Sequence, residues 1–382
     1  MSFLLEGITA VTWQQAVMYV VGIILIWLAV KKEYEPSLLL PLGFGAILVN
    51  LPYSGVVDQM VQGKVPAAGI IEWLFKTGIE ASEAMPILLF IGIGAMIDFG
   101  PLLSQPVLFL FGAAAQFGIF AAILIACLMG FDLRDAASIG IIGAADGPTS
   151  ILVSQVLGSG YIGPIAVAAY SYMALVPIIQ PFAIRLVTTR KERCIHMEYN
   201  PKSVNKQLRI AFPIAVTIIV GLISPQSVAL VGFLMFGNLL RECGVLGSLS
   251  QTAQNEFANI ITLLLGITIS FSMRAEQFVN PATLMIMVLG LVAFVFDTIG
   301  GVLFAKLINV FLKMAGKKPV NPMIGGCGIS AFPMSSRVVQ RMAAREEPGN
   351  IILMQAAGTN VSGQVASVIA GGLVISIVSQ YL

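Results

Sequence analysis

Long apolar runs separated by short polar stretches make up most of this sequence. The runs of membrane-relevant length cover about residues 15–31, 37–51, 84–99, 105–130, 161–188, 208–224, 226–241, 257–273, 281–312 and 350–381. A helix needs about 20 mostly apolar residues to cross the hydrocarbon core of a bilayer. The pattern therefore predicts an all-α polytopic membrane protein with about ten crossing helices.

Two further apolar runs, 137–158 and 322–343, are interrupted by glycine and proline. The first contains Gly-Ala-Ala-Asp-Gly-Pro at 143–148, and the second contains a glycine-rich stretch at 325–333. Proline removes a backbone donor and collides with the preceding helical turn. Unwound backbone at membrane depth survives only inside protein or beside a wet cavity. We therefore expect both runs to form broken or re-entrant segments.

Two short motifs recur in the same order in both halves of the chain. In the first motif, Pro36 and Gly43-Phe44 match Pro225 and Gly232-Phe233. In the second, Ile142-Gly143-Ala144 matches Ile324-Gly325-Gly326. We infer two homologous transmembrane repeats, 1–188 and 208–382, joined by a basic linker at 189–207.

The distribution of charge predicts how these repeats sit in the membrane. Seven of the 21 basic residues gather around the linker: Arg185, Arg190, Lys191, Arg193, Lys202, Lys206 and Arg209. Basic loops face the cytoplasm, so the linker is assigned there, and alternation then places the net acidic loop 52–83 outside. Each half then has about five crossings and one re-entrant segment, and an odd number makes the halves inverted repeats. Such repeats are typical of transporters whose binding site lies between broken helices.

Composition excludes several classes of protein. Of the 382 residues, 57% are hydrophobic and only 10% are charged, against about 25% charged in soluble domains. A basic stretch between two apolar spans is not typical of nucleic-acid binding, and the four cysteines lack CxxC spacing and are expected to be free. The sequence contains neither a GxxxxGKS/T nucleotide loop nor a Met-Lys-Met biotin-attachment motif. Its start has no basic n-region or cleavage site, so we expect no removable signal peptide.

Asp146 is the strongest candidate for chemistry. A charge at the bilayer centre costs about 2.5–3.5 kcal/mol on insertion scales, and this carboxylate stands at a helix break. We interpret it as a cation ligand and proton acceptor, alternately occupied. The alternative is an N-cap for the following helix, a role that polar residues also fill. Thr149 and Ser150 could add hydroxyl oxygens for a hard cation, or hydrogen-bond the helix backbone instead.

Other polar side chains within apolar runs are weaker candidates. Tyr172 is a phenol near the middle of its run, where it could face the site or pack in the core. Asn321 and Ser330 supply neutral oxygens beside the second break, where backbone carbonyls would be freed for coordination, and Asn360 is polar inside the last run. Arg337 could hold a carboxylate or anchor the cytoplasmic side.

Two further carboxylates have simpler interpretations. Asp297 lies in the middle of a run with no helix break beside it, which favours a buried structural hydrogen bond. Asp98 lies near the end of a run, which favours an interfacial position.

Three motifs together form a long and unusual pattern. They are Gly143-Ala-Ala-Asp-Gly-Pro-Thr-Ser-Ile151, Gly237-Asn-Leu-Leu-Arg-Glu242, and the stretch from Asn321 to Pro333 with Arg337 beyond it. This pattern resembles the membrane β subunit of the sodium-pumping, biotin-dependent decarboxylases, over essentially the whole chain. The members of that family serve oxaloacetate, methylmalonyl-CoA, glutaconyl-CoA and malonate decarboxylases.

The resemblance implies a function and its participants. Carboxybiotin, supplied in trans by a partner subunit, is decarboxylated, and this drives Na⁺ outward with consumption of an external proton. The implied partners are biotinylated carboxyltransferase or biotin-carrier subunits and a small single-span membrane subunit, in an oligomeric complex in the cytoplasmic membrane of a bacterium or archaeon. By motif position, the family's aspartate, tyrosine, asparagine, glycine, serine and arginine correspond to Asp146, Tyr172, Asn321, Gly325, Ser330 and Arg337.

These assignments lead to a mechanistic hypothesis with Asp146, Tyr172 and Arg337 as the catalytic candidates. We expect Na⁺ to occupy one oxygen site at Asp146 with Asn321 and another at Tyr172 with Ser330. Gly325 and Asn360 complete the expected Na⁺ residues, and Arg337 orients the carboxylate of carboxybiotin by a charge-assisted contact.

Two other functions also fit an inverted repeat. A secondary transporter that exchanges Na⁺ for protons or an organic anion, without enzymatic activity, fits it equally well, and a passive channel fits less well. Only the decarboxylase pump requires a biotinylated partner. The decarboxylase substrate is not predicted, because substrate chemistry belongs to the carboxyltransferase partner.

Overall fold

The computed structural model describes residues 2–33, 36–61, 65–81, 83–197 and 204–381. Lys64 and Lys202, two of the charged residues used to predict the topology, lie outside these residues. The described chain is helical apart from one antiparallel hairpin, β1 (Asp58–Val61) with β2 (Val65–Ala68). All four cysteines are free, as predicted. The all-α class of the sequence prediction is confirmed.

The first half begins with a short helix and ends with a long bent one. Its helices are α1 (Ser2–Thr9), α2 (Trp13–Lys32), α3 (Pro36–Asn50), α4 (Ile70–Phe75), the π-helical turn η1 (Lys76–Glu80), α5 (Ala84–Met96), α6 (Gly100–Ser104), α7 (Leu108–Ala115), α8 (Phe117–Leu128), α9 (Leu133–Gly140), the 3₁₀ turn η2 (Ile141–Ala144), α10 (Gly147–Val156) and α11 (Ile162–Val187).

The second half follows a short linker helix, α12 (Arg190–Arg193). Its helices are α13 (Lys206–Ile223), the 3₁₀ turn η3 (Pro225–Ser227), α14 (Val228–Glu242), α15 (Gly247–Thr252), the π turn η4 (Ala253–Phe257), α16 (Ala258–Ile269), the 3₁₀ turn η5 (Ser270–Met273), α17 (Ala275–Phe278), α18 (Pro281–Met314), the 3₁₀ segment η6 (Pro322–Gly328), α19 (Met334–Glu346) and α20 (Leu353–Val378).

Every predicted apolar run contains a helix, but fewer helices satisfy a strict criterion for spanning. Among the described residues, six are long and apolar enough to cross a membrane, or eight if two bent pairs each form one span. The bent pairs are α4–η1 with α5, at 67°, and the two arms of α11, at 72°. α3 is apolar but only 15 residues long, shorter than a straight crossing needs. The count of ten crossings therefore stays a prediction.

The predicted loop 52–83 is partly helical, since α4 and η1 together cover residues 70–80. Three of its charged residues repeat every four residues along this helix. Glu72, Lys76 and Glu80 are spaced four residues apart, and Glu72 forms an ion pair with Lys76 at 2.5 Å. Ile71 and Phe75, which precede two of these charges in the sequence, are buried. The sequence analysis considered only the net charge of this loop, so it did not detect the amphipathic pattern.

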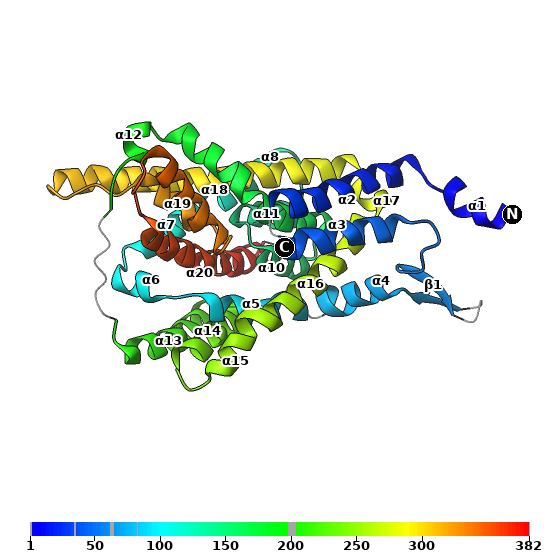
Figure 1. Ribbon diagram of the computed structural model, residues 1–382, viewed down its shortest axis with the longest axis horizontal. Coiled ribbons are helices and arrows are strands. Elements are labelled where there is room, and N and C mark those ends of the chain that lie inside the picture. Colours follow the sequence, from blue (N-terminus) through cyan, green and yellow to red (C-terminus); the bar gives the residue numbers. More distant parts are fainter. Residues whose placement is uncertain (1, 34–35, 62–64, 82, 198–203, 382) are drawn as a thin grey trace.

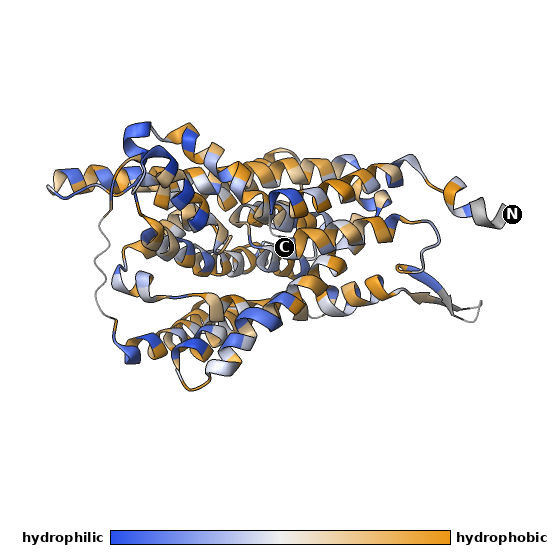
Figure 2. Cartoon of the chain, in the orientation of Figure 1, coloured by the Kyte–Doolittle hydropathy of each residue, from blue (hydrophilic) through white to orange (hydrophobic). Residues whose placement is uncertain are grey.

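Among the candidate spans, the most buried and the most exposed helices differ clearly. Within its most apolar window, α20 is 72% buried, whereas α13 is only 11% buried and exposes a row of apolar side chains. Figure 1 shows α10 and α20 in the middle of the molecule, with α18 along one side and α13 and α14 along the other. Figure 2 shows apolar residues throughout this helical body and polar residues at α12 and the end of α18.

The two halves pack against each other through small residues. α3 packs on α16, and α5 packs on α14. A Cβ added at Gly94 would lie 1.9 Å from the Leu234 carbonyl oxygen, and one at Gly237 would lie 2.0 Å from that of Ile91. Such close backbone approach is what glycine permits between membrane helices, so these two glycines set the spacing of α5 and α14.

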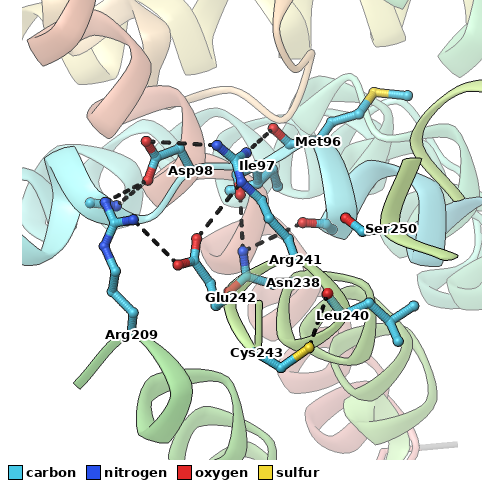
Figure 3. A network of polar contacts seen from close by, with 12 residues as sticks. Met96, Ile97, Asp98, Arg209, Asn238, Leu240, Arg241, Glu242, Cys243 and Ser250 are labelled. Atoms are coloured by element: carbon cyan, nitrogen blue, oxygen red, sulfur yellow. Dashed lines mark hydrogen bonds and ion pairs between the residues drawn. The ribbon is translucent and has the colours of Figure 1, made fainter. Parts of the chain in front are cut away.

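Polar groups reinforce the same contact at the end of α5 (Figure 3). Asn238 donates to the Ile97 carbonyl at 2.9 Å, and Arg241 donates to that of Met96 at 2.8 Å. Arg209 bridges Asp98 and Glu242, both at 3.3 Å. The motif Gly237–Glu242 therefore satisfies the open carbonyls at the C-terminal end of a helix from the other half.

Candidate functional site

The first broken segment is built around Asp146. After η2, Ala145 adopts a left-handed conformation with φ of 52°, Asp146 is extended, and α10 starts at Gly147. Pro148 thus stands in the first turn of α10, where its missing N–H costs nothing. Asp146 Oδ1 accepts a hydrogen bond from the Thr149 N–H at 3.3 Å. Asp146 is therefore an N-cap, but this uses only one of its two carboxylate oxygens.

The second carboxylate oxygen faces the other half of the chain. Asp146 Oδ2 accepts hydrogen bonds from Ser330 Oγ at 3.2 Å, from Ser367 Oγ at 2.9 Å and from Gln364 Nε2 at 3.3 Å. The Ser330 and Ser367 hydroxyls also contact each other. Asp146 is only 4% exposed, so three donors from the second half surround one buried carboxylate oxygen from the first.

The backbones of the two broken segments also meet. The Ser330 N–H donates to the Ala144 carbonyl at 2.8 Å, which joins the stretch after η6 to the end of η2. The sequence-based expectation that the two interrupted segments come together is confirmed by this contact.

Four carbonyls of the second broken segment, which we expected to be open for coordination, already accept hydrogen bonds in this structure. Buried side-chain amides bind them: Gln180 donates to Gly326 at 2.8 Å, Gln116 to Gly328 at 3.1 Å, and Asn360 to Cys327 at 3.3 Å and Ile329 at 2.7 Å. Unwound backbone inside an apolar protein must find such partners. Asn360 therefore lies beside the site but binds backbone rather than Asp146.

Asn321 and Gly325 make contacts with the backbone in this conformation and form no hydrogen bond with Asp146. The Asn321 amide donates to the carbonyls of Arg193 and Ile195, both at 2.9 Å, and its oxygen caps η6 through the Met323 N–H. A Cβ at Gly325 would lie 2.1 Å from the Gly301 carbonyl oxygen on α18. Asn321 thus ties η6 to the linker and does not bond Asp146.

Tyr172 and Arg337 also lie away from the Asp146 carboxylate. The Tyr172 hydroxyl donates to the Met287 carbonyl on α18, so the expected pair of Tyr172 with Ser330 does not form here. Arg337 is exposed on α19. The hydroxyl of Ser150, a candidate oxygen ligand, donates to the Asp146 carbonyl at 2.7 Å instead.

A cavity of about 170 Å³ adjoins Asp146. Its polar lining includes Asp146, Ser330 and Gln364, with Asn259 and Thr262 from α16. Carboxylate, hydroxyl and amide oxygens suit hard cations such as Na⁺ rather than the soft ions that prefer thiolate or imidazole. Within the part of the chain that the structure describes, no cluster of His, Cys, Asp and Glu forms a transition-metal site.

Sequence reasoning missed Ser367 and Gln364 as partners of Asp146. Both lie on α20, and with Asn360 they follow a spacing of four and three residues along an apolar helix. That spacing places the three polar side chains on one face. The stripe was detectable in the sequence, but only the fold reveals that it faces Asp146.

Asp297 has the structural role expected of it. Its Oδ1 accepts a hydrogen bond from the Ile119 N–H at 3.0 Å, just after α8 begins. The same N–H also donates to the Gln116 carbonyl at 3.2 Å, and the prediction of a buried hydrogen bond at Asp297 is confirmed. Asp98, expected at an interface, is partly exposed and lies in the ion-pair network of Figure 3.

Comparison with known proteins identifies the family. A sequence model of the Na⁺-transporting oxaloacetate decarboxylase beta subunit matches residues 14–378. Methylmalonyl-CoA decarboxylase subunit beta of Propionigenium modestum is 46% identical, covering 94% of each chain. Glutaconyl-CoA decarboxylase subunit beta of Acidaminococcus fermentans is 45% identical over 98% of this chain and 96% of that protein. The oxaloacetate decarboxylase beta chain of Klebsiella pneumoniae is 40% identical, covering 95% of each. The chain therefore belongs to the family of Na⁺-transporting decarboxylase beta subunits.

Proposed function

We propose that this chain, the membrane subunit of a decarboxylase sodium pump, binds Na⁺ in the cavity at Asp146. The observation that carries the proposal is the convergence of Ser330, Ser367 and Gln364 on one oxygen of Asp146. An ionisable side chain buried within a membrane protein is expensive and marks an ion pathway by default. The oxygen-rich donor set matches the ion that the family transports.

The same carboxylate can hold a proton in place of Na⁺. A protonated Asp146 donates one hydrogen bond, and the hydroxyls of Ser330 and Ser367 can accept as well as donate. The site therefore stays hydrogen-bonded in both states, with Na⁺ on the carboxylate or H⁺ on the acid. Because Na⁺ and H⁺ cannot occupy Asp146 at the same time, outward movement of Na⁺ is coupled to consumption of a proton from outside.

The two halves are proposed to be inverted repeats. Apart from the short α1, each half has two helices, then a helix with a π turn (η1 and η4), and later a broken segment and a long helix. The packing is reciprocal, since α3 contacts α16 while α14 contacts α5, and α10 contacts α20 while α19 contacts α11. In Figure 1, α2 and α13 start from opposite ends of the molecule. Because the ligands of Asp146 come from the other repeat, movement of one repeat against the other would open and close the site.

Arg337 is proposed to receive the carboxylate of carboxybiotin, which a partner subunit supplies and whose decarboxylation provides the driving energy. Arg337, Arg341 and Arg345 are all exposed and follow a four-residue spacing on α19. This puts three guanidinium groups on one helix face, a donor set that fits a carboxylate. α19 directly follows the irregular segment that carries Ser330, so an anion bound on α19 would act on the residues that contact Asp146.

The remaining candidates are proposed to position the site rather than to bind the ion in this conformation. Tyr172 holds α11 to α18 through Met287, Asn321 holds η6 to the linker, and Gly325 allows η6 to approach α18. Asn360 holds the backbone just before Ser330. We further propose biotinylated carboxyltransferase or biotin-carrier subunits and a small single-span subunit as partners, in a bacterial or archaeal cytoplasmic membrane.

The test is ²²Na⁺ uptake into liposomes that contain the chain with its partner subunits. Oxaloacetate, methylmalonyl-CoA and glutaconyl-CoA are supplied in turn, and one of them is expected to drive uptake. Asp146→Asn is expected to lower uptake and Na⁺-dependent decarboxylation at least 100-fold, while Asp132→Asn, on an exposed carboxylate, is the matched control. Normal pumping by Asp146→Asn would overturn the proposal. Uptake driven by a pH gradient without any acid would favour a secondary transporter instead.

A further inference from the structure

A second tyrosine on α11, Tyr170, is closer to the Asp146 cavity than Tyr172. Tyr170 lines this cavity together with Asp146, whereas Tyr172 does not. Its side chain is only 1% exposed, and its hydroxyl is buried without a hydrogen-bond partner in the described residues. An unpaired buried hydroxyl costs about 1–3 kcal/mol, a cost that a ligand or water in the cavity would offset.

The geometry of α11 separates the two tyrosines. Residues two apart on a helix are rotated by about 200°, so they face nearly opposite sides. The Tyr172 hydroxyl accordingly reaches Met287 on α18, and Tyr170 faces the first broken segment. Only one of these two phenols can take part in the Asp146 site.

The phenol end of Tyr170 lies directly over the residue after Asp146. A Cβ added at Gly147 would lie 2.4 Å from Cζ of Tyr170 and 2.5 and 2.6 Å from its two Cε atoms. Cζ is the atom that carries the hydroxyl. Glycine at 147 therefore leaves the space that the oxygen-bearing end of the ring fills beside its Cα, a space that the Cβ of any other residue would occupy.

We infer that the Tyr170 hydroxyl is an oxygen ligand for the cation held at Asp146, directly or through one water. The inference rests on the proposed function and adds a residue to that site. A neutral phenol both donates and accepts a hydrogen bond, so Tyr170 serves the Na⁺ state as an oxygen ligand and the protonated state as an acceptor. It also adds a polar group from the first half to the lining of the cavity.

The test uses the full chain in its complex with the partner subunits. Tyr170→Phe removes only the hydroxyl and is expected to raise, about tenfold, the Na⁺ concentration that gives half-maximal protection against thermal unfolding. Tyr19→Phe removes a phenol that donates to the Asn50 carbonyl far from the cavity and is expected to shift it less than twofold. Tyr172→Phe is expected to lower the transport rate with less than a threefold change in Na⁺ affinity.

The outcomes separate this inference from the proposed function. If Asp146→Asn abolishes Na⁺ protection while Tyr170→Phe binds Na⁺ like the unaltered chain, only the role of Tyr170 is overturned. If Asp146→Asn retains protection, the Na⁺ site itself is overturned. Should Tyr170→Phe not fold, 3-fluorotyrosine placed at position 170 keeps the hydroxyl. Its ¹⁹F resonance is expected to shift with Na⁺ but not with K⁺, and an unchanged resonance would also refute the inference.

Discussion

The two broken segments meet at one point but handle their unwound backbone differently. In the first segment the break ends in a carboxylate, Asp146, which caps α10 and accepts three further hydrogen bonds from side chains of the other half. In the second segment the open carbonyls are bound by the amides of Gln116, Gln180 and Asn360. The first segment therefore carries a buried carboxylate, whereas the second presents neutral carbonyls, four of which (residues 326–329) already accept hydrogen bonds from side-chain amides.

The difference gives a physical reason to propose the ion site at the first break rather than at the second. A neutral backbone bound by amides has little to gain from a cation, because its carbonyls already have partners. A buried carboxylate keeps a strong preference for a positive charge, whether Na⁺ or H⁺. The second segment reaches the Asp146 carboxylate through the Ser330 hydroxyl, and the Ser330 N–H is bonded to the Ala144 carbonyl.

The largest expected effect comes from removing the hydroxyls that the second half presents to Asp146. The double change Ser330→Ala with Ser367→Ala should weaken Na⁺ binding about 100-fold, since two oxygen contacts of about 1.4 kcal/mol each are lost. Half-maximal Na⁺ activation of decarboxylation in the reconstituted complex measures this. Ser376→Ala, which removes a hydroxyl bonded to its own helix on α20, is the control. Equal Na⁺ affinity in both variants would mean that the second half does not form the ion site.

The next largest effect is expected from Gly325→Ala, which tests how tightly the second segment packs against α18. Gly325→Ala places a methyl group 2.1 Å from the Gly301 carbonyl oxygen, where backbone faces backbone. Overpacking of this kind costs about 2–3 kcal/mol, so thermal unfolding of the purified complex should occur at lower temperature. Gly247→Ala, where an added Cβ meets nothing within 4 Å, should be neutral or stabilising. A stable Gly325→Ala protein would show that η6 can move away from α18.

A smaller effect separates structural amides from ion ligands. Gln116→Met keeps the side-chain volume but leaves the Gly328 carbonyl without its donor, at a cost of about 1–2 kcal/mol in stability. Na⁺ affinity should change less than twofold. Thermal unfolding and Na⁺ titration of the same sample measure both quantities, with the exposed Gln251→Met as control. A loss of Na⁺ affinity without a loss of stability would assign the second segment a direct part in binding.

The smallest effect concerns the linker that holds the second segment through Asn321. Burial raises the pKa of Glu192, but hydrogen bonds from Thr189 and Lys306 outweigh it and hold that pKa below its usual value of 4.5. The stabilisation is therefore complete above about pH 4.5 and is lost as the pH falls through the lower folded-state pKa. Glu192→Gln should cost less than about 1 kcal/mol near pH 7 and flatten the acid dependence of thermal unfolding. An unchanged acid limb in Glu192→Gln would exclude this linkage.

The sequence was informative about Asp146 and the breaks because bilayer physics penalises both so strongly. A lone carboxylate between glycines and proline in an apolar run has few explanations, and the interrupted segments were recognisable for the same reason. The helix over 70–80 was missed, since its charges were counted without their four-residue spacing. The hydrogen bonds to carbonyls 326–329 were not predicted, because the amides that donate them are far away in sequence. These amides belong to Gln116, directly after α7, Gln180 on α11 and Asn360 on α20.

The sequence by itself determined the class of the protein, its family, its apolar runs and the carboxylate at the first break. Only the tertiary structure decided which polar groups share that carboxylate. Asn321 and Tyr172 match the family's motif but point elsewhere in this conformation, while Ser367 and Gln364 come from a helix more than 200 residues along the chain. Helix periodicity dictates which side chains share a face, but which face meets Asp146 depends on how the helices pack, and packing is a property of the whole chain.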